Sequence, residues 1–164
     1  MKENIGIVGA GICGLSCALA LSKHDNNITI YERDSAPPSG SADEAFFDWS
    51  RRGAAQFRHP HAFLGVMCNL LQERYPELVK KLWEAGARKI SFEEMVPDEL
   101  KESYVPVPND KKMWLLMCRR ATMESVLRKY VEEIPTITIL SKHEVVAPEF
   151  DLRDSIISLQ GLQV

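Results

Sequence analysis

Three glycines near the N-terminus have the spacing of a loop that binds phosphate. Gly9, Gly11 and Gly14 form a G-x-G-x-x-G pattern between a short apolar run and a segment with helical spacing. In such a loop, Gly9 permits a tight turn, Gly11 lets the backbone approach a pyrophosphate, and Gly14 lets the helix pack closely on the strand. The pattern predicts a nucleotide site in which the N–H groups around Ile12 and Cys13 point at the phosphates.

An acidic residue follows at the distance that a dinucleotide site requires. Glu32 ends a second apolar run, close to the spacing of about 20 residues at which such sites carry a ribose-binding carboxylate. We expect this carboxylate to accept hydrogen bonds from two ribose hydroxyls and to repel the 2′-phosphate of NADP, which leaves FAD or NAD. Arg33 favours NADP, but it follows the acidic residue and does not replace it. The alternative is a βαβ unit that uses the same glycines only for packing.

The segments that position these residues have the order strand, helix, strand. Residues 5–8 form a compact apolar run, which is typical of a buried parallel strand and not of an alternating, half-exposed one. Helical spacing continues over 12–24 and is broken at Asp25, and residues 28–31 form a second short strand. This βαβ unit predicts an α/β, Rossmann-like domain with a parallel sheet and flanking helices.

The remaining chain is expected to belong to the same partial domain, which covers 1–164. Its parts are the βαβ unit at 1–34, a mainly helical excursion at 50–112, and a return to the sheet with the start of a hairpin at 113–164. The individual elements that we predict are a loop at 35–43, helices at 61–75 and 77–84, irregular structure at 88–110, a strand at 113–118, a helix at 120–133, a parallel strand at 136–140, and one arm of a hairpin from Asp154 to Val164 with no partner strand following.

Several motifs occur together in one order along the chain. The glycine loop continues into Leu15, Ala18 and Leu21 at helical spacing, and the second strand closes with Tyr31-Glu32-Arg33. Further along stand Arg51-Arg52-Gly53, the stretch 56–64 with its two histidines, and Cys118-Arg119-Arg120. In this order the chain resembles the N-terminal part of FAD-dependent monooxygenases related to aromatic hydroxylases and squalene epoxidase.

The resemblance implies a cofactor and its contacts. FAD would be held by the glycine loop, by Glu32 and the adjoining Arg33, by Arg52 and Arg120, and by the backbone of Val146 in a strand over 141–146. The activity implied is an NAD(P)H-dependent oxidation of a small organic substrate, for which no catalytic residue can be named. Complete members of this monooxygenase family also carry Asp-Gly and Gly-Asp motifs. None of the nine glycines here adjoins an Asp, so we expect an FAD-binding domain that is incomplete at its C-terminus, with the missing part as a partner.

Composition and charge limit the other functions. The formal net charge is −3 and the basic residues are scattered, so we expect no nucleic-acid partner. No run approaches the roughly 18 apolar residues of a membrane span, and no signal peptide is evident, so a cytoplasmic location is expected. The four cysteines are expected to be reduced, buried small residues. His59 and His61 make a poor ligand set, and no metal site is predicted.

Two other classes of protein fit the same glycine motif. One is a non-catalytic nucleotide- or partner-binding protein that keeps the fold, as the Rab GDP-dissociation inhibitors and escort proteins do. The other is a fragment of an NAD-dependent dehydrogenase, in which the two arginine pairs have no assigned role.

Overall fold

The structure, a computed structural model, describes residues 2–153 and 156–164. Contacts within the chain divide it into two units. The first consists of Met1–Pro38, Trp49–Gly53 and Leu127–Val164, and the second of Ser39–Asp48 and Ala54–Val126. Among the described residues, two sheets lie in the first unit and one lies in the second.

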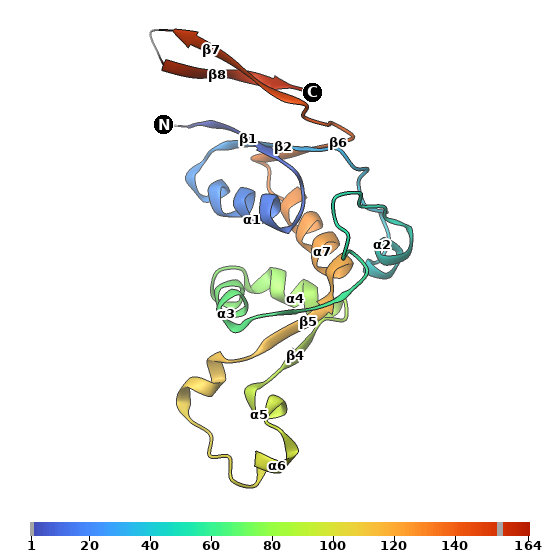
Figure 1. The fold of residues 1–164 in the computed structure, drawn as a ribbon, viewed down its shortest axis with the longest axis vertical. Helices are drawn as coiled ribbons and strands as arrows, with labels where there is room; N and C mark the ends of the chain where they lie inside the picture. Colours follow the sequence, from blue (N-terminus) through green and yellow to red (C-terminus); the bar gives the residue numbers. More distant parts are fainter. Residues whose placement is uncertain (1, 154–155) are drawn as a thin grey trace. The chain divides into compact units, whose positions relative to one another are not determined.

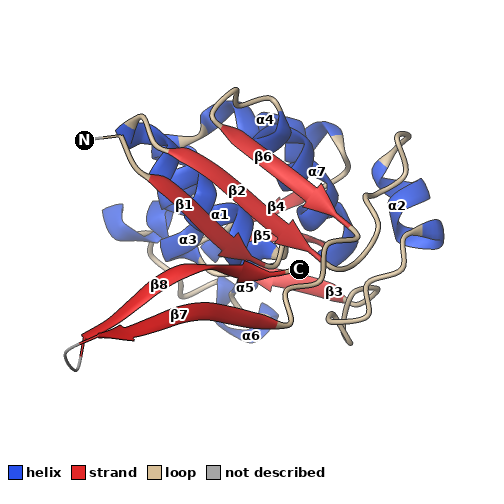
Figure 2. Ribbon diagram, turned by 90° about the horizontal axis from the view of Figure 1, so that it is seen from above, coloured by secondary structure: helices blue, strands red, loops and turns tan. Residues whose placement is uncertain are grey.

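A parallel sheet forms the centre of the first unit. Its strands are β1 (Asn4–Val8), β2 (Asn27–Glu32) and β6 (Ile137–Ser141), in the order β1-β2-β6. The helix α1 (Ile12–Leu21) connects β1 to β2, and Figure 2 shows the three strands side by side. The predicted βαβ unit and the predicted parallel strand near 136–140 are therefore confirmed, and with them the α/β fold class.

The prediction that β1 is a fully buried strand is wrong. Its residues alternate between exposed and half-buried, and Val8 is 61% exposed. The reason is its place in the sheet, because β1 is an edge strand and α1 lies on one face only (Figure 1). In β2, the central strand, Ile28 and Ile30 are completely buried.

The first helix ends where the sequence predicts. Leu15, Ala18 and Leu19 form its buried face. A 3₁₀ turn, η1 (Ser22–His24), follows the helix. Asp25 then adopts a left-handed backbone with φ of 54°, which stops the helix and turns the chain towards β2.

Two strands at the end of the chain form an antiparallel hairpin. They are β7 (Ala147–Arg153) and β8 (Ile156–Gln163). The strand β8 is the predicted hairpin arm, and its partner is β7, the strand that precedes it, which the sequence does not predict. Asp154, the predicted start of that arm, lies outside the described residues. The strand predicted at 141–146 is wrong, since β6 ends at Ser141 and the chain to Val146 is a connection.

The second unit contains an antiparallel sheet in the order β3-β5-β4. Its strands are β3 (Pro60–Phe63), β5 (Leu115–Arg119) and β4 (Arg88–Ile90). The predicted return to the first sheet at residue 113 is therefore wrong, because β5 pairs with β3 and β4. The chain returns through α7 (Arg120–Glu132) to β6.

Helices of the second unit differ in part from those predicted. The predicted helix at 61–75 begins later, as α3 (Gly65–Arg74), because the preceding residues pair with β5. The next helix, α4 (Pro76–Glu84), begins with its proline, and Gly86 with φ of 90° follows its end, as predicted. The segments expected to be loop or irregular contain α2 (Ala42–Asp48), α5 (Phe92–Met95), α6 (Asp98–Lys101) and the 3₁₀ turn η2 (Pro108–Lys112).

Local capping explains one of these short helices. The Ser91 hydroxyl accepts the Glu94 N–H, and the Glu94 carboxylate accepts the Ser91 N–H, which is a capping box.

Among the described residues, no helix has both the length and the apolar character that crossing a membrane requires.

Candidate nucleotide-binding site

The turn after β1 depends on the conformation of Gly9. Its φ of 95° lies in the left-handed region that residues with a side chain rarely adopt. Its N–H donates to the Tyr31 carbonyl at 2.7 Å, which ties the turn to β2. The turn thus brings the start of α1 to the end of the neighbouring strand.

The other two glycines have different surroundings. A Cβ at Gly14 would lie 1.9 Å from the Gly9 carbonyl oxygen, so only glycine fits there. A Cβ at Gly11 would have Arg51 Nη2 as its nearest neighbour, at 3.9 Å, which is ordinary contact. Gly14 is therefore required by the packing of the turn, whereas the absence of a side chain at Gly11 leaves backbone accessible to a ligand.

The start of α1 is suited to an anion. Gly11 is the N-cap, followed by Ile12 and Cys13 in the first turn. The first N–H groups of a helix have no partner within it, and the helix dipole is positive at this end. No acidic side chain lies in the first turn to neutralise it. This end of α1 can therefore accept a phosphate.

Glu32, at the end of β2, has a buried carboxylate that is joined to the glycine turn. The whole Glu32 residue is 4% exposed. The Ala10 N–H donates to Oε2 at 2.7 Å, and the Asp34 N–H donates to Oε1 at 2.9 Å. Arg51 Nη1 lies 2.9 Å from Oε2. The structure thus brings the acidic residue and the glycine turn together. That they bind a nucleotide stays a prediction.

Two further residues belong to this cluster. Asp34 is not among the site residues that the sequence predicts, and Arg51 is predicted only as part of the motif Arg51-Arg52-Gly53. Asp34 is 5% exposed, and its Oδ1 accepts from Arg52 Nε at 2.9 Å while its Oδ2 accepts the Arg52 N–H at 3.0 Å. Arg51 Nη1 lies 3.4 Å from Oδ2. Arg51 has a side chain that is 6% exposed and lies over the Trp49 ring, whereas the Arg52 side chain is 63% exposed. Arg51 is therefore the arginine beside the glycine loop.

The environment of Glu32 sets its protonation. Burial acts to raise the pKa of Glu32, but the N–H groups of Asp34 and Ala10 and the guanidinium of Arg51 outweigh it, so the pKa is lowered. The ionised carboxylate therefore stabilises the folded chain above its unfolded pKa of about 4.3, and this contribution is lost as the pH falls through the lower folded value.

We expect acid sensitivity that depends on Glu32. The Glu32→Gln variant should be less stable than the unaltered chain at pH 7, and its free energy of unfolding should fall less steeply as the pH drops from about 5 to about 3. Urea unfolding at a series of pH values gives the free energy of unfolding of both proteins as a function of pH, and hence the slope for each. Equal slopes would show that Glu32 does not carry this part of the acid response.

The other predicted FAD contacts have partners of their own. The exposed Arg33 faces Glu144 at 3.9 Å. Arg120 belongs to the second unit, where its Nε donates to the fully buried Glu124 at 2.7 Å. Val146 has an exposed side chain, and its N–H donates to the Gln163 carbonyl at 2.9 Å. The roles of these three residues in binding FAD stay predictions.

The histidines and cysteines form no further site in the part of the chain that the structure describes. No group of three or more His, Cys, Asp or Glu side chains gathers there as a metal site. His61 Nδ1 lies 3.0 Å from the His59 carbonyl. Contrary to the prediction of buried thiols, Cys13 and Cys17 are exposed. Burial raises the pKa of Cys118 to about 12, so this thiol stays protonated at neutral pH.

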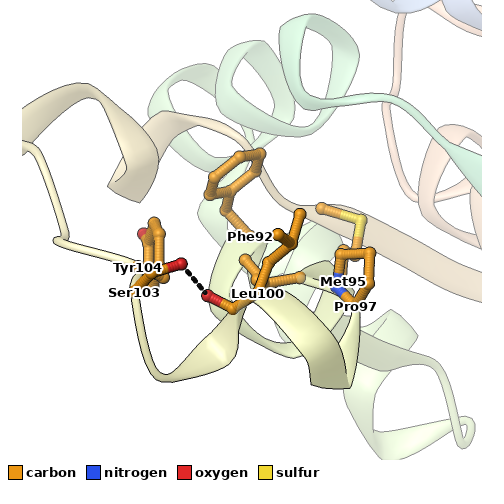
Figure 3. A pocket seen from close by; sticks show the side chains of 7 residues that line it. Phe92, Met95, Pro97, Leu100, Ser103 and Tyr104 are labelled. Atoms are coloured by element: carbon orange, nitrogen blue, oxygen red, sulfur yellow. Dashed lines mark hydrogen bonds between the residues drawn. The ribbon is translucent and has the colours of Figure 1, made fainter.

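An open apolar cavity of about 450 Å³ lies in the second unit (Figure 3). Phe92, Met95 and Leu100 are among its lining side chains. Both hydroxyl groups in the lining have acceptors within the unit: Ser103 Oγ donates to the Leu100 carbonyl at 3.1 Å, and Tyr104 donates to Asp110. The bond to Asp110 raises the pKa of Tyr104 to about 12. The cavity therefore offers an apolar surface.

Comparison with known proteins identifies the fold. Residues 7–80 match the model of a family described as NAD(P)-binding Rossmann-like domain. No curated protein sequence gives a significant match. One similar solved structure is the Diels-Alderase PyrE3 of pyrroindomycin biosynthesis, with 17% identity and a TM-score of 0.58 over 98% of this chain and 29% of that chain. A second is p-nitrophenol 4-monooxygenase PnpA from Pseudomonas putida, with 16% identity and a TM-score of 0.53 over 97% of this chain and 36% of that chain. A third is tetrameric 2-methyl-3-hydroxypyridine-5-carboxylic acid oxygenase, with 13% identity and a TM-score of 0.55 over 97% of this chain and 36% of that chain.

These similarities confirm the Rossmann-like fold predicted from the glycine motif and the strand order. The identities are low, so the likeness is one of fold. The chain spans only 29% to 36% of the length of these three solved structures.

Proposed function

We propose that this chain is the FAD-binding N-terminal portion of a flavin-dependent oxidoreductase, an NAD(P)H-dependent monooxygenase that acts on a small organic substrate. One observation carries the proposal. The Ala10 N–H in the glycine turn donates to the buried carboxylate of Glu32 at 2.7 Å, so a phosphate-binding loop and a ribose-binding acid lie in one site. This is the pair of features that a dinucleotide requires.

The described residues fit the adenosine and pyrophosphate parts of FAD. The start of α1 and the backbone at Gly11 would hold the pyrophosphate, and Glu32 would accept hydrogen bonds from the ribose. Arg51 would supply a positive charge beside the phosphates, in the place that the sequence assigned to Arg52. Bound FAD supplies the redox chemistry itself, and the chain binds and orients it.

Support for the monooxygenase class comes from two sources. The motifs from Gly9 to Arg120 resemble those of FAD-dependent monooxygenases, and two of the similar solved structures are named as an oxygenase and a monooxygenase. Each of those chains extends well beyond the 36% that this chain covers. We therefore propose the oxidation, with its reductant and its substrate, for a protein that includes this chain. We also propose a cytoplasmic location and a partner segment that completes the domain.

Cofactor binding by the purified chain tests the proposal. We expect FAD and ADP to bind, with flavin absorption bands that stay with the protein on gel filtration, and NAD to bind no more tightly than FAD. Titration calorimetry with FAD, ADP and NAD measures the three affinities. Preference for NAD over FAD would indicate the dehydrogenase alternative, and failure to bind any of the three would indicate a non-catalytic protein that keeps the fold.

A further inference from the structure

Arg51 lies on the carboxylate that the ribose of a bound nucleotide would need. Its Nη1 is 2.9 Å from Glu32 Oε2 and 3.4 Å from Asp34 Oδ2. Its Nη2 is 3.9 Å from the position that a Cβ of Gly11 would take. One guanidinium group therefore lies between the carboxylate expected to bind the ribose and the backbone expected to bind the pyrophosphate.

The hydrogen-bonding capacity of Glu32 shows what this arrangement excludes. Each carboxylate oxygen accepts about two hydrogen bonds. Oε2 accepts the Ala10 N–H in addition to Arg51, which leaves no room for a ribose hydroxyl. Oε1 accepts the Asp34 N–H at 2.9 Å and has room for one more donor. Two ribose hydroxyls can bind to this carboxylate only if Arg51 leaves Oε2.

Movement of Arg51 is unfavourable unless another anion receives its charge. The side chains of Arg51 and Glu32 are 6% and 5% exposed. Separating this buried pair is unfavourable because it deprives the Glu32 carboxylate of its arginine, even though Asp34 stays beside Arg51. A pyrophosphate at Gly11 would provide that anion next to Nη2, while Asp34 stays within reach of Nη1. Adenosine, which has the ribose but no phosphate, provides none.

We infer that Arg51 is a positioning residue that passes from Glu32 to the pyrophosphate when a nucleotide binds. Both ribose hydroxyls are then recognised only in ligands that carry a pyrophosphate, and adenosine alone is held by one hydroxyl. This inference rests on the nucleotide site of the proposed function, and it adds a selection between ligands that share the same adenosine.

The Arg51→Gln variant tests this exchange with adenosine and ADP as probes. We expect it to bind adenosine about three- to tenfold more tightly than the unaltered chain, because Glu32 Oε2 becomes accessible, and to bind ADP about tenfold or more weakly, because the charge is lost. Arg74→Gln is the matched control. It removes the same charge from an exposed side chain in the last turn of α3, so it should change adenosine affinity less than about twofold. Titration calorimetry measures both ligands.

A second measurement uses the unaltered chain, so that it does not depend on how the variant folds. For ADP, removal of either the 2′- or the 3′-hydroxyl should weaken binding severalfold, whereas for adenosine one of the two removals should have no effect. The exchange is overturned if both hydroxyls of adenosine are required equally, or if a folded Arg51→Gln variant binds adenosine no more tightly. Either result leaves the nucleotide site intact, whereas failure of the unaltered chain to bind ADP overturns the proposed function itself.

Discussion

Replacing Glu32 with glutamine should weaken FAD binding by about 1.5–3 kcal/mol, or roughly 10- to 150-fold in Kd. The carboxylate accepts charge-assisted hydrogen bonds, and the neutral amide that replaces it accepts weaker ones and also presents donors. Calorimetric titration of FAD into the folded variant at pH 7 gives the loss directly.

Glu144→Gln is the matched control for this change. It removes the same charge from an exposed side chain that pairs with the exposed Arg33 at 3.9 Å, so FAD affinity should stay within about twofold of the unaltered value. If Glu32→Gln and Glu144→Gln bind FAD equally well, the assignment of Glu32 to the ribose is wrong.

Two alanine substitutions in the glycine loop should separate folding from binding. Gly14→Ala should lower the free energy of unfolding by about 3 kcal/mol, because the new Cβ would meet the Gly9 carbonyl oxygen at 1.9 Å and both groups belong to the backbone of the turn. Gly11→Ala should leave stability within about 0.5 kcal/mol, since its nearest neighbour is 3.9 Å away. It should nevertheless weaken ADP binding at least about tenfold, because the methyl group takes the place of the pyrophosphate.

Urea unfolding and ADP titration of the same two variants provide the measurements. Each variant is the control for the other, since both add one methyl group to the same loop. Equal losses of stability would contradict the different surroundings of the two glycines. Normal ADP affinity in Gly11→Ala would show that the pyrophosphate does not approach this loop.

The glycine loop and Glu32 could be predicted because their roles depend on local spacing. The turn at Gly9 and the close packing at Gly14 follow from backbone geometry within a few residues, and Glu32 follows from the length of one βαβ unit. The roles of Arg51 and Asp34 could not be predicted in the same way. Their ion pair joins segments that are far apart in the sequence, and nothing local distinguishes the buried Arg51 from the exposed Arg52.

Pairing between distant strands also explains the errors in secondary structure. Phe63 and Leu64 continue the apolar spacing of α3, so the sequence predicts one helix, but Phe63 belongs to β3 and pairs with Leu116 of β5. For a similar reason the sequence predicts that the strand near residue 113 joins the first sheet, whereas β5 pairs with β3 and β4 in the second unit. A strand such as β5 carries no local signal that identifies its partner.

The hairpin of β7 and β8 has a consequence for the chain in solution. Phe150, Leu152, Ile157 and Leu159 are each more than 60% exposed, and the two strands form a sheet of their own. A two-stranded ribbon with open edges and apolar side chains is a template for further strand pairing. We therefore expect self-association of concentrated samples to involve this ribbon, and charged substitutions of its exposed apolar side chains to reduce that self-association.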